Sequence, residues 1–203
     1  MGKIKITKKE IDDILKIKGY IKGSFLKVFY SYVLEKKGEE GIKIIEKKLS
    51  EVNINLSLEN IKSFKWYPIS FVTIVLVLVL ETFDWDESIA FDIGYNAISY
   101  SFLNRVLMNY VADLNFSSGG AEKYWKNQVS IGNLETVEYK KEEKYSIVRI
   151  KGFKKLHPTV YEYIKGFMAK FTETVRKLNN VKIEQTKSLY NNDPYDEFKT
   201  TWK

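Results

Sequence analysis

The sequence predicts an α+β fold in which a mainly helical N-terminal part packs with a four-stranded antiparallel sheet near the C-terminus. Over most of residues 1–130, apolar residues recur at three- and four-residue steps, the period of amphipathic helices. From Leu134 onward, apolar residues alternate in two hairpin-like stretches that flank one helical stretch, giving the order β-β-α-β-β. The length fits one domain over residues 1–203, with residues 131–203 as its sheet-plus-helix part.

The helical part divides at glycine and proline signals. Residues 23–36 carry a wide apolar face, and Gly38 supplies a stop before a second amphipathic stretch at residues 42–52, so a helical hairpin is expected. The apolar segment 69–80 follows Pro68, which fits the first turn of a helix. A long helical pattern covers residues 86–111, and a short one at residues 121–128 follows the break at residues 117–120.

Two hairpins frame the C-terminal helix. Residues 136–140 and 145–151 form the first predicted hairpin, and residues 181–189 and 195–202 form the second. Between them His157 and Pro158 open a helix whose apolar stripe includes Ile164, Phe167 and Phe171. The four strands can pair into one sheet with this helix covering one face.

Composition excludes several functional classes. The net charge is +7, but the chain has only three arginines, and its lysines are interleaved with glutamates, so nucleic acid is not an expected partner. There are no cysteines, which excludes disulfides and thiolate metal sites. The polar N-terminus lacks a signal-peptide pattern, and segment 69–80 is too short to span a bilayer. A cytoplasmic location is therefore expected.

Several short motifs point to a family. The run YEYIKGFM at residues 161–168, followed by VKIE at residues 181–184 and by Phe198, resembles the C-terminal signature of 4-vinyl-reductase-type ligand-binding domains. Their superfamily also includes haem nitric-oxide-binding domains and subunits of the TRAPP tethering particle. Residues 21–24 and 38–41, the WYP segment at residues 66–68 and Gly94 resemble an uncharacterised bacterial branch of it.

The resemblance implies ligand binding, but the residues depart from the family pattern in two respects. Vinyl-reductase-type domains commonly carry zinc-binding cysteines near the final hairpin, and TRAPP subunits can be lipidated on cysteine, whereas this chain has none. Haem-binding members use a histidine on a helix, whereas the single histidine here, His157, directly precedes Pro158. On these grounds neither zinc nor haem is expected, and no cofactor is predicted.

Candidate chemical groups have competing structural explanations. His157 could act as a general base or ligand, but its position before proline favours a helix N-cap. The Ser-Ser-Gly-Gly run at residues 117–120 could bind an anion, although an ordinary loop explains it as well. Asp84, Asp86 and Glu87 could bind a cation, but acidic residues also favour the first turn of a helix.

The aromatic side chains carry the remaining functional signal. If the helices face each other over the sheet, these residues could line an apolar pocket, or they could simply fill the core. The predicted pocket residues are Tyr95, Tyr100, Phe102, Trp125, Tyr161, Tyr163 and Phe167. We therefore expect a non-enzymatic, sensor-like domain that binds a small apolar or aromatic ligand and reports to a partner protein or through self-association. The alternative is a TRAPP-like scaffold with a filled core that forms a homodimer.

Overall fold

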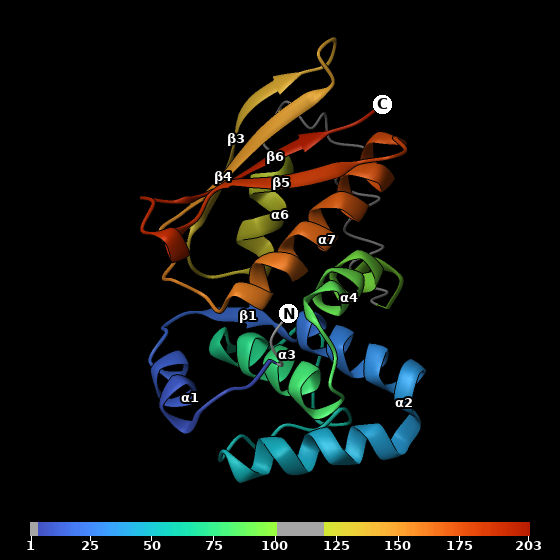
Figure 1. The fold of residues 1–203 in the computed structure, drawn as a ribbon, viewed down its shortest axis with the longest axis vertical. Coiled ribbons are helices and arrows are strands. Elements are labelled where there is room, and N and C mark those ends of the chain that lie inside the picture. Colours follow the sequence, from blue (N-terminus) through green and yellow to red (C-terminus); the bar gives the residue numbers. More distant parts are fainter. Residues whose placement is uncertain (1–3, 101–119) are drawn as a thin grey trace.

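The computed structural model describes residues 4–100 and 120–203, with the sheet at one end of the molecule and most of the helices at the other (Figure 1). The elements in chain order are α1 (Lys8–Leu15), β1 (Tyr20–Lys22), α2 (Gly23–Glu51), β2 (Trp66–Pro68), α3 (Ser70–Thr82), α4 (Glu87–Tyr100), α6 (Gly120–Gln128), β3 (Asn133–Lys140), β4 (Tyr145–Lys151), α7 (Pro158–Arg176), β5 (Lys182–Lys187), the short 3₁₀-helix η2 (Leu189–Asn191) and β6 (Asp196–Thr201).

The predicted sheet is confirmed. Its four strands are antiparallel in the order β3-β4-β6-β5, so the two hairpins meet where β4 pairs with β6. Both α6 and α7 lie on the same side of it (Figure 1). Along β4 the buried positions alternate, with Ser146, Val148 and Ile150 buried, and this alternation gives the sheet one face for the core.

The long α2 is two helices joined at a glycine. Gly38 has φ 67° and ψ −168°, a conformation outside the helical region that favours glycine, and the chain turns there. This bend confirms the helix stop expected at Gly38. The preceding helix α1 has a capping box, because Glu10 N–H donates to the Thr7 hydroxyl while the Glu10 carboxylate accepts from Thr7 N–H.

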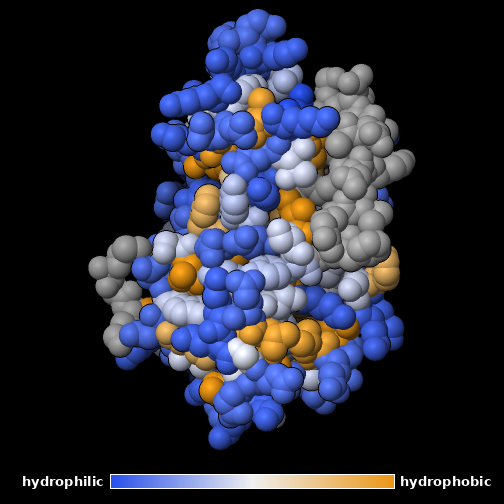
Figure 2. Space-filling model, turned by 90° about the vertical axis from the view of Figure 1, so that its right-hand side faces the viewer, coloured by the Kyte–Doolittle hydropathy of each residue, from blue (hydrophilic) through white to orange (hydrophobic). Residues whose placement is uncertain are grey.

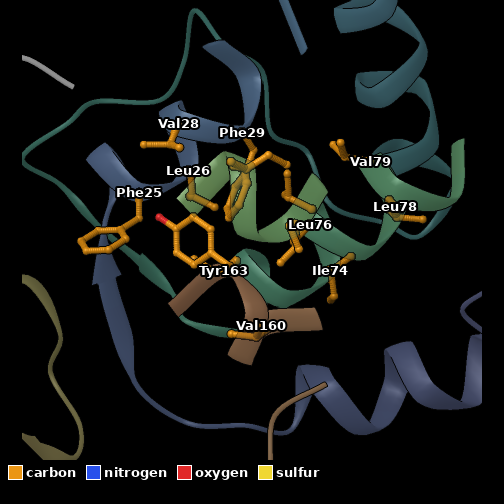
Figure 3. Packing of buried hydrophobic residues seen from close by; sticks show 14 of the residues in the cluster. Phe25, Leu26, Val28, Phe29, Ile74, Leu76, Leu78, Val79, Val160 and Tyr163 are labelled. Atoms are coloured by element: carbon orange, nitrogen blue, oxygen red, sulfur yellow. The ribbon is translucent and has the colours of Figure 1, made fainter. Parts of the chain in front are cut away.

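The apolar helix α3 lies in the core of the helical part. Its residues from Val72 to Leu80 are almost all inaccessible to solvent. Figure 3 shows Ile74 and Leu76 of α3 in the same buried cluster as Phe29 of α2 and Tyr163 of α7. Within the described ranges, no helix combines the length and the apolar character needed to cross a membrane.

A two-stranded ribbon that the sequence pattern did not predict pairs β1, which precedes α2, with β2, which precedes α3. In it Tyr20 pairs with Pro68, Ile21 with Tyr67, and Lys22 with Trp66. Pro68 was expected in the first helical turn but is the last residue of β2, and α3 begins at Ser70. The end of a two-stranded ribbon tolerates proline because no ladder hydrogen bond from its nitrogen is required there.

Helices α4 and α7 cross at two glycines. A Cβ atom built on Gly94 would lie 2.0 Å from the carbonyl oxygen of Tyr163, and one built on Gly166 would lie 2.0 Å from that of Phe91. The two backbones therefore approach more closely than any side chain would allow. This crossing connects the helical part to the helix that covers the sheet.

Candidate functional site

An apolar cavity of about 90 Å³ lies between α6, α7 and the inner face of the sheet. Helix α7 provides one wall through residues spaced three to five positions apart, including Tyr163, Phe167 and Phe171. This spacing places them on one side of the helix, which is why one stripe of α7 faces the cavity. The opposite wall is formed by inward-facing strand residues such as Val148 and Ile150.

Aromatic rings close the cavity between the helices. Tyr124 of α6 stacks on Phe167 with ring centroids 6.0 Å apart, and it packs against Phe171 at 5.7 Å. Phe25 of α2 lies 5.9 Å from Phe167 on the other side. Offset and tilted pairs at these distances are favourable aromatic contacts. Three helices therefore meet at Phe167.

One polar group in the wall is a buried phenol. Tyr163 is 3% exposed, and its hydroxyl has no hydrogen-bond partner among the described residues. In Figure 3 this hydroxyl points toward Phe25. Burial raises the pKa of Tyr163 and that of Tyr124 far above the usual range of tyrosine, so both phenols are neutral at physiological pH.

A cation lies toward the opposite end of the cavity. Arg176 lines it, and its Nη1 donates to the hydroxyl of Tyr139 at 2.9 Å. The guanidinium carbon is 4.2 Å from the centroid of the same ring, which adds a cation–π contact. Partial burial lowers the pKa of Arg176, but a guanidinium still keeps its charge in proteins.

The structure brings together only some of the predicted pocket residues. Trp125, Tyr163 and Phe167 line the cavity. Phe102 lies outside the described residues. The other three predicted side chains do not line this cavity: Tyr95, Tyr100 and Tyr161.

Each of those three tyrosines has another partner. The Tyr95 hydroxyl donates to Glu173 Oε2 at 2.5 Å, and the Tyr100 hydroxyl donates to Glu35. The Tyr161 hydroxyl accepts from Leu156 N–H at 3.3 Å, and burial raises its pKa to about 12. These hydroxyls form hydrogen bonds that join α4 to α7 and α2, and α7 to the segment before it.

Sequence reasoning missed several lining residues. Among them are Tyr124, Tyr139, Met168, Arg176 and Trp202. Tyr139 and Trp202 stack with centroids 5.8 Å apart at the edge of the sheet. The period of α7 contained a usable signal, because Phe171 follows Tyr163 and Phe167 at four-residue steps. No pattern in the sequence identified the contribution of β3 or of the residue after β6.

Two further cavities are more polar. One, of about 180 Å³, is bounded by the start of α7 and by β5, with Tyr161, Gln185 and Ser188 in its wall. The other is a cleft of about 620 Å³ between α1, the end of α2 and α3. Its wall mixes Ile11 and Leu78 with charged groups such as Glu81. Neither presents a buried polar side chain lacking a partner.

The single histidine has a structural role. His157 is the N-cap of α7, where its Nδ1 accepts from Thr159 N–H at 3.4 Å. It does not line the apolar cavity. Burial lowers its pKa, and Glu10 partly opposes that effect. The helix-cap interpretation of His157 is thus confirmed.

The acidic Asp86, next to Trp85, forms hydrogen bonds at the start of α4. Asp86 Oδ1 accepts from Ser88 N–H at 2.9 Å and from the Ser88 hydroxyl at 2.5 Å, just before α4 begins at Glu87. These hydrogen bonds lower the pKa of Asp86. The described ranges contain no group of three histidine, aspartate or glutamate side chains placed to hold a metal ion.

The arrangement of the helices against a four-stranded antiparallel sheet is similar to that of solved H-NOX structures. An H-NOX protein from S. oneidensis in the Fe(II)NO state aligns with a TM-score of 0.63 and 11% identity, over 90% of this chain and 99% of that one. An unliganded Fe(II) H-NOX mutant from K. algicida aligns with a TM-score of 0.55 and 15% identity, over 90% of this chain and 97% of that one.

An oxygen-binding H-NOX domain related to soluble guanylate cyclases gives a TM-score of 0.56 at 12% identity, over 90% of this chain and 95% of that chain. No family model matches the sequence, and no curated protein matches it. At these identities the likeness establishes the fold. It supports the haem nitric-oxide-binding part of the expected resemblance and does not support the 4-vinyl-reductase or TRAPP parts.

The prediction that no cofactor is present is contradicted by this likeness. One of the matched structures concerns haem distortion in the H-NOX family, and others are named by the state of their iron, so the fold points to haem. The prediction failed because it gave the position of the single histidine and the lack of cysteine more weight than the resemblance to haem nitric-oxide-binding domains.

The described side chains do not fit haem in the cavity as it stands. Haem iron is held by histidine, cysteine, methionine or tyrosine, and among the described residues the cavity wall offers Met168 and tyrosines but no histidine or cysteine. Its volume of about 90 Å³ is also below the roughly 300–1,000 Å³ typical of ligand pockets. We therefore assign no iron ligand.

Proposed function

We propose that this chain is a small-molecule-binding domain of sensor type whose binding site is the cavity between α6, α7 and the sheet. The observation that carries the proposal is a buried, mainly aromatic cavity containing the unpartnered hydroxyl of Tyr163. Pockets for small molecules combine apolar walls with a few placed polar groups. The H-NOX fold supports the same interpretation, since the matched proteins bind nitric oxide or oxygen.

The polar groups of the cavity wall lie far apart along α7. Tyr163 and Arg176 are thirteen positions apart on α7, or about 20 Å along a helix that rises about 1.5 Å per residue. Between them the wall is formed by Phe167, Met168 and Phe171. A ligand that fits the cavity would place an apolar body against these side chains and a polar atom near one of the two ends.

Two neighbouring residues of β4 offer a matched test. Val148 faces the cavity and is 5% exposed, whereas Ile147 points to the opposite face of the sheet. Val148→Phe should fill the cavity and abolish binding, while Ile147→Phe should leave binding unchanged. Thermal melting should first establish that both variants are folded.

Haem is the first ligand to test because the fold points to it. Purified protein is titrated with haemin, and the Soret band of bound haem is followed for the parent chain and for both β4 variants. A saturable Soret signal that is lost only in Val148→Phe would place haem in this cavity. A signal that survives Val148→Phe would locate haem elsewhere.

Native mass spectrometry extends the test to other ligands. A small-molecule mass on the parent chain and on Ile147→Phe, but not on Val148→Phe, is the expected result. A parent chain that carries no added mass, binds no haem and forms a dimer would overturn the proposal and favour the filled-core scaffold.

A further inference from the structure

A surface on the β1–β2 ribbon gathers aromatic and basic side chains away from the cavity. Tyr20, Phe64 and Trp66 are 54%, 72% and 44% exposed, although they are large apolar residues. We define the aromatic–lysine surface as these three residues together with Lys22 and Lys65. Clustered exposed aromatics mark interaction sites more often than single ones do.

The strand register places Tyr20, Lys22 and Trp66 on one face of the ribbon. Lys22 pairs directly with Trp66, so both point to the same side of the ribbon, and Tyr20 lies two residues before Lys22. Lys22 Nζ lies 3.9 Å from the Trp66 ring centroid and donates to the carbonyl oxygen of Phe64 at 2.9 Å. Ile21, between them, faces the core and is 5% exposed.

Backbone hydrogen bonds hold the turn that carries Phe64. Gly23 N–H donates to Lys65 O at 2.9 Å, and Ser24 N–H donates to Ser63 O at 3.1 Å. Lys65 N–H closes the turn onto Lys62 O at 3.0 Å. The exposure of Phe64 is therefore built into an ordered turn.

The charge of the ribbon has one sign. Residues 16–23 and 61–68 contain five lysines and no aspartate or glutamate. One of the five, Lys16, pairs with Asp13. Basic residues around exposed tryptophan and phenylalanine suit an anionic membrane surface, where the rings enter the headgroup region and the lysines meet lipid phosphates.

We propose that the aromatic–lysine surface docks this protein peripherally on membranes containing anionic lipids. A lipid surface fits better than a peptide, because peptide anchors need a pocket to fill. Tyr20, Phe64 and Trp66 line none of the cavities described above. A membrane instead accepts protruding rings and needs no pocket.

Vesicle flotation tests this docking. The full chain is mixed with vesicles of phosphatidylcholine alone or of phosphatidylcholine with phosphatidylglycerol. Binding is expected only to the second kind. Phe64→Ser should weaken it by roughly tenfold or more, as expected for a lost buried ring, and Lys65→Gln by about fivefold.

Matched controls lie on other surfaces. Tyr190, which is 45% exposed, and Lys141, in the β3–β4 turn, lie outside the surface, so Tyr190→Ser and Lys141→Gln should leave vesicle binding unchanged. The proposal would be overturned by equal binding to both vesicle types or by no binding to either. It would also be overturned if Lys65→Gln weakened vesicle binding while Phe64→Ser did not. Binding of an acidic peptide without binding of vesicles would likewise overturn it. Occupancy of the cavity does not enter this test.

Discussion

At the residue scale, neighbouring tyrosines of α7 have different roles because of the helical turn. Tyr161 and Tyr163 are two positions apart, and residues at that spacing do not share a helix face. Tyr163 reaches the cavity wall, whereas Tyr161 turns toward the segment before α7 and accepts from Leu156. Predicting both as pocket residues overlooked this geometry. The four-residue step from Tyr163 to Phe167 was the informative one.

His157 should make stability depend on pH. Burial lowers its pKa in the folded state, so below about pH 6.5 the unfolded chain binds a proton more readily than the folded chain. Stability supplied by neutral His157 is thus present above that pH and is lost as the pH falls toward the folded pKa. His157→Asn keeps a capping side chain that does not titrate.

Thermal melts of the parent chain and of His157→Asn between pH 8 and pH 5 measure this effect. The melting temperature of the parent should fall more steeply over the range, since other groups titrate equally in both. Parallel curves would show that His157 does not titrate differently on unfolding.

At the element scale, the α4–α7 crossing depends on two glycines. In a solvent-exposed helix, glycine to alanine usually stabilises by up to about 1 kcal/mol. Gly166→Ala should do the opposite, because its Cβ would meet the carbonyl oxygen of Phe91 at 2.0 Å. Separating the helices should cost about 1–3 kcal/mol, which lowers the melting temperature by about 2–4 °C per kcal/mol. A stabilised variant would contradict the crossing.

Elements in which an apolar pattern runs over many residues could be predicted, and very short elements could not. The alternation along β4 and the stripe of α7 each run over seven residues or more and specified the sheet and its covering helix. Strands β1 and β2 have three residues each and pair across more than forty positions. Three residues contain too little alternation to reveal a strand, so Pro68 was assigned to the following helix.

At the scale of the whole molecule, one end of the surface is mainly hydrophilic. In Figure 2 the upper end, which carries the β3–β4 hairpin of Figure 1, is hydrophilic, and hydrophobic residues gather lower on this face. The turn of that hairpin consists of Lys141, Glu142, Glu143 and Lys144. This mixed charge explains part of the lysine content without nucleic acid. The basic ribbon of β1 and β2 differs because it lacks acidic residues.

A core shared by the helical and sheet parts should make them unfold together. A single cluster of buried side chains runs from Ile11 in α1 through Leu76 in α3 and Tyr163 in α7 to Phe198 in β6. Cooperative unfolding follows when neither part can keep its apolar surface buried without the other. We therefore expect the single domain predicted over residues 1–203 to show one transition.

Urea unfolding followed by two probes can test this cooperativity. Far-UV circular dichroism reports mainly on the helices. Trp202 stacks on Tyr139 beside the sheet, and its fluorescence reports on the C-terminal part once the other three tryptophans are changed to phenylalanine. Coincident midpoints and slopes are expected because α7 contacts both parts, with Phe29 of α2 5.2 Å from Tyr163 by ring centroids. A Trp202 transition at a different urea concentration would divide the chain into two folding units, with the α4–α7 crossing as their interface.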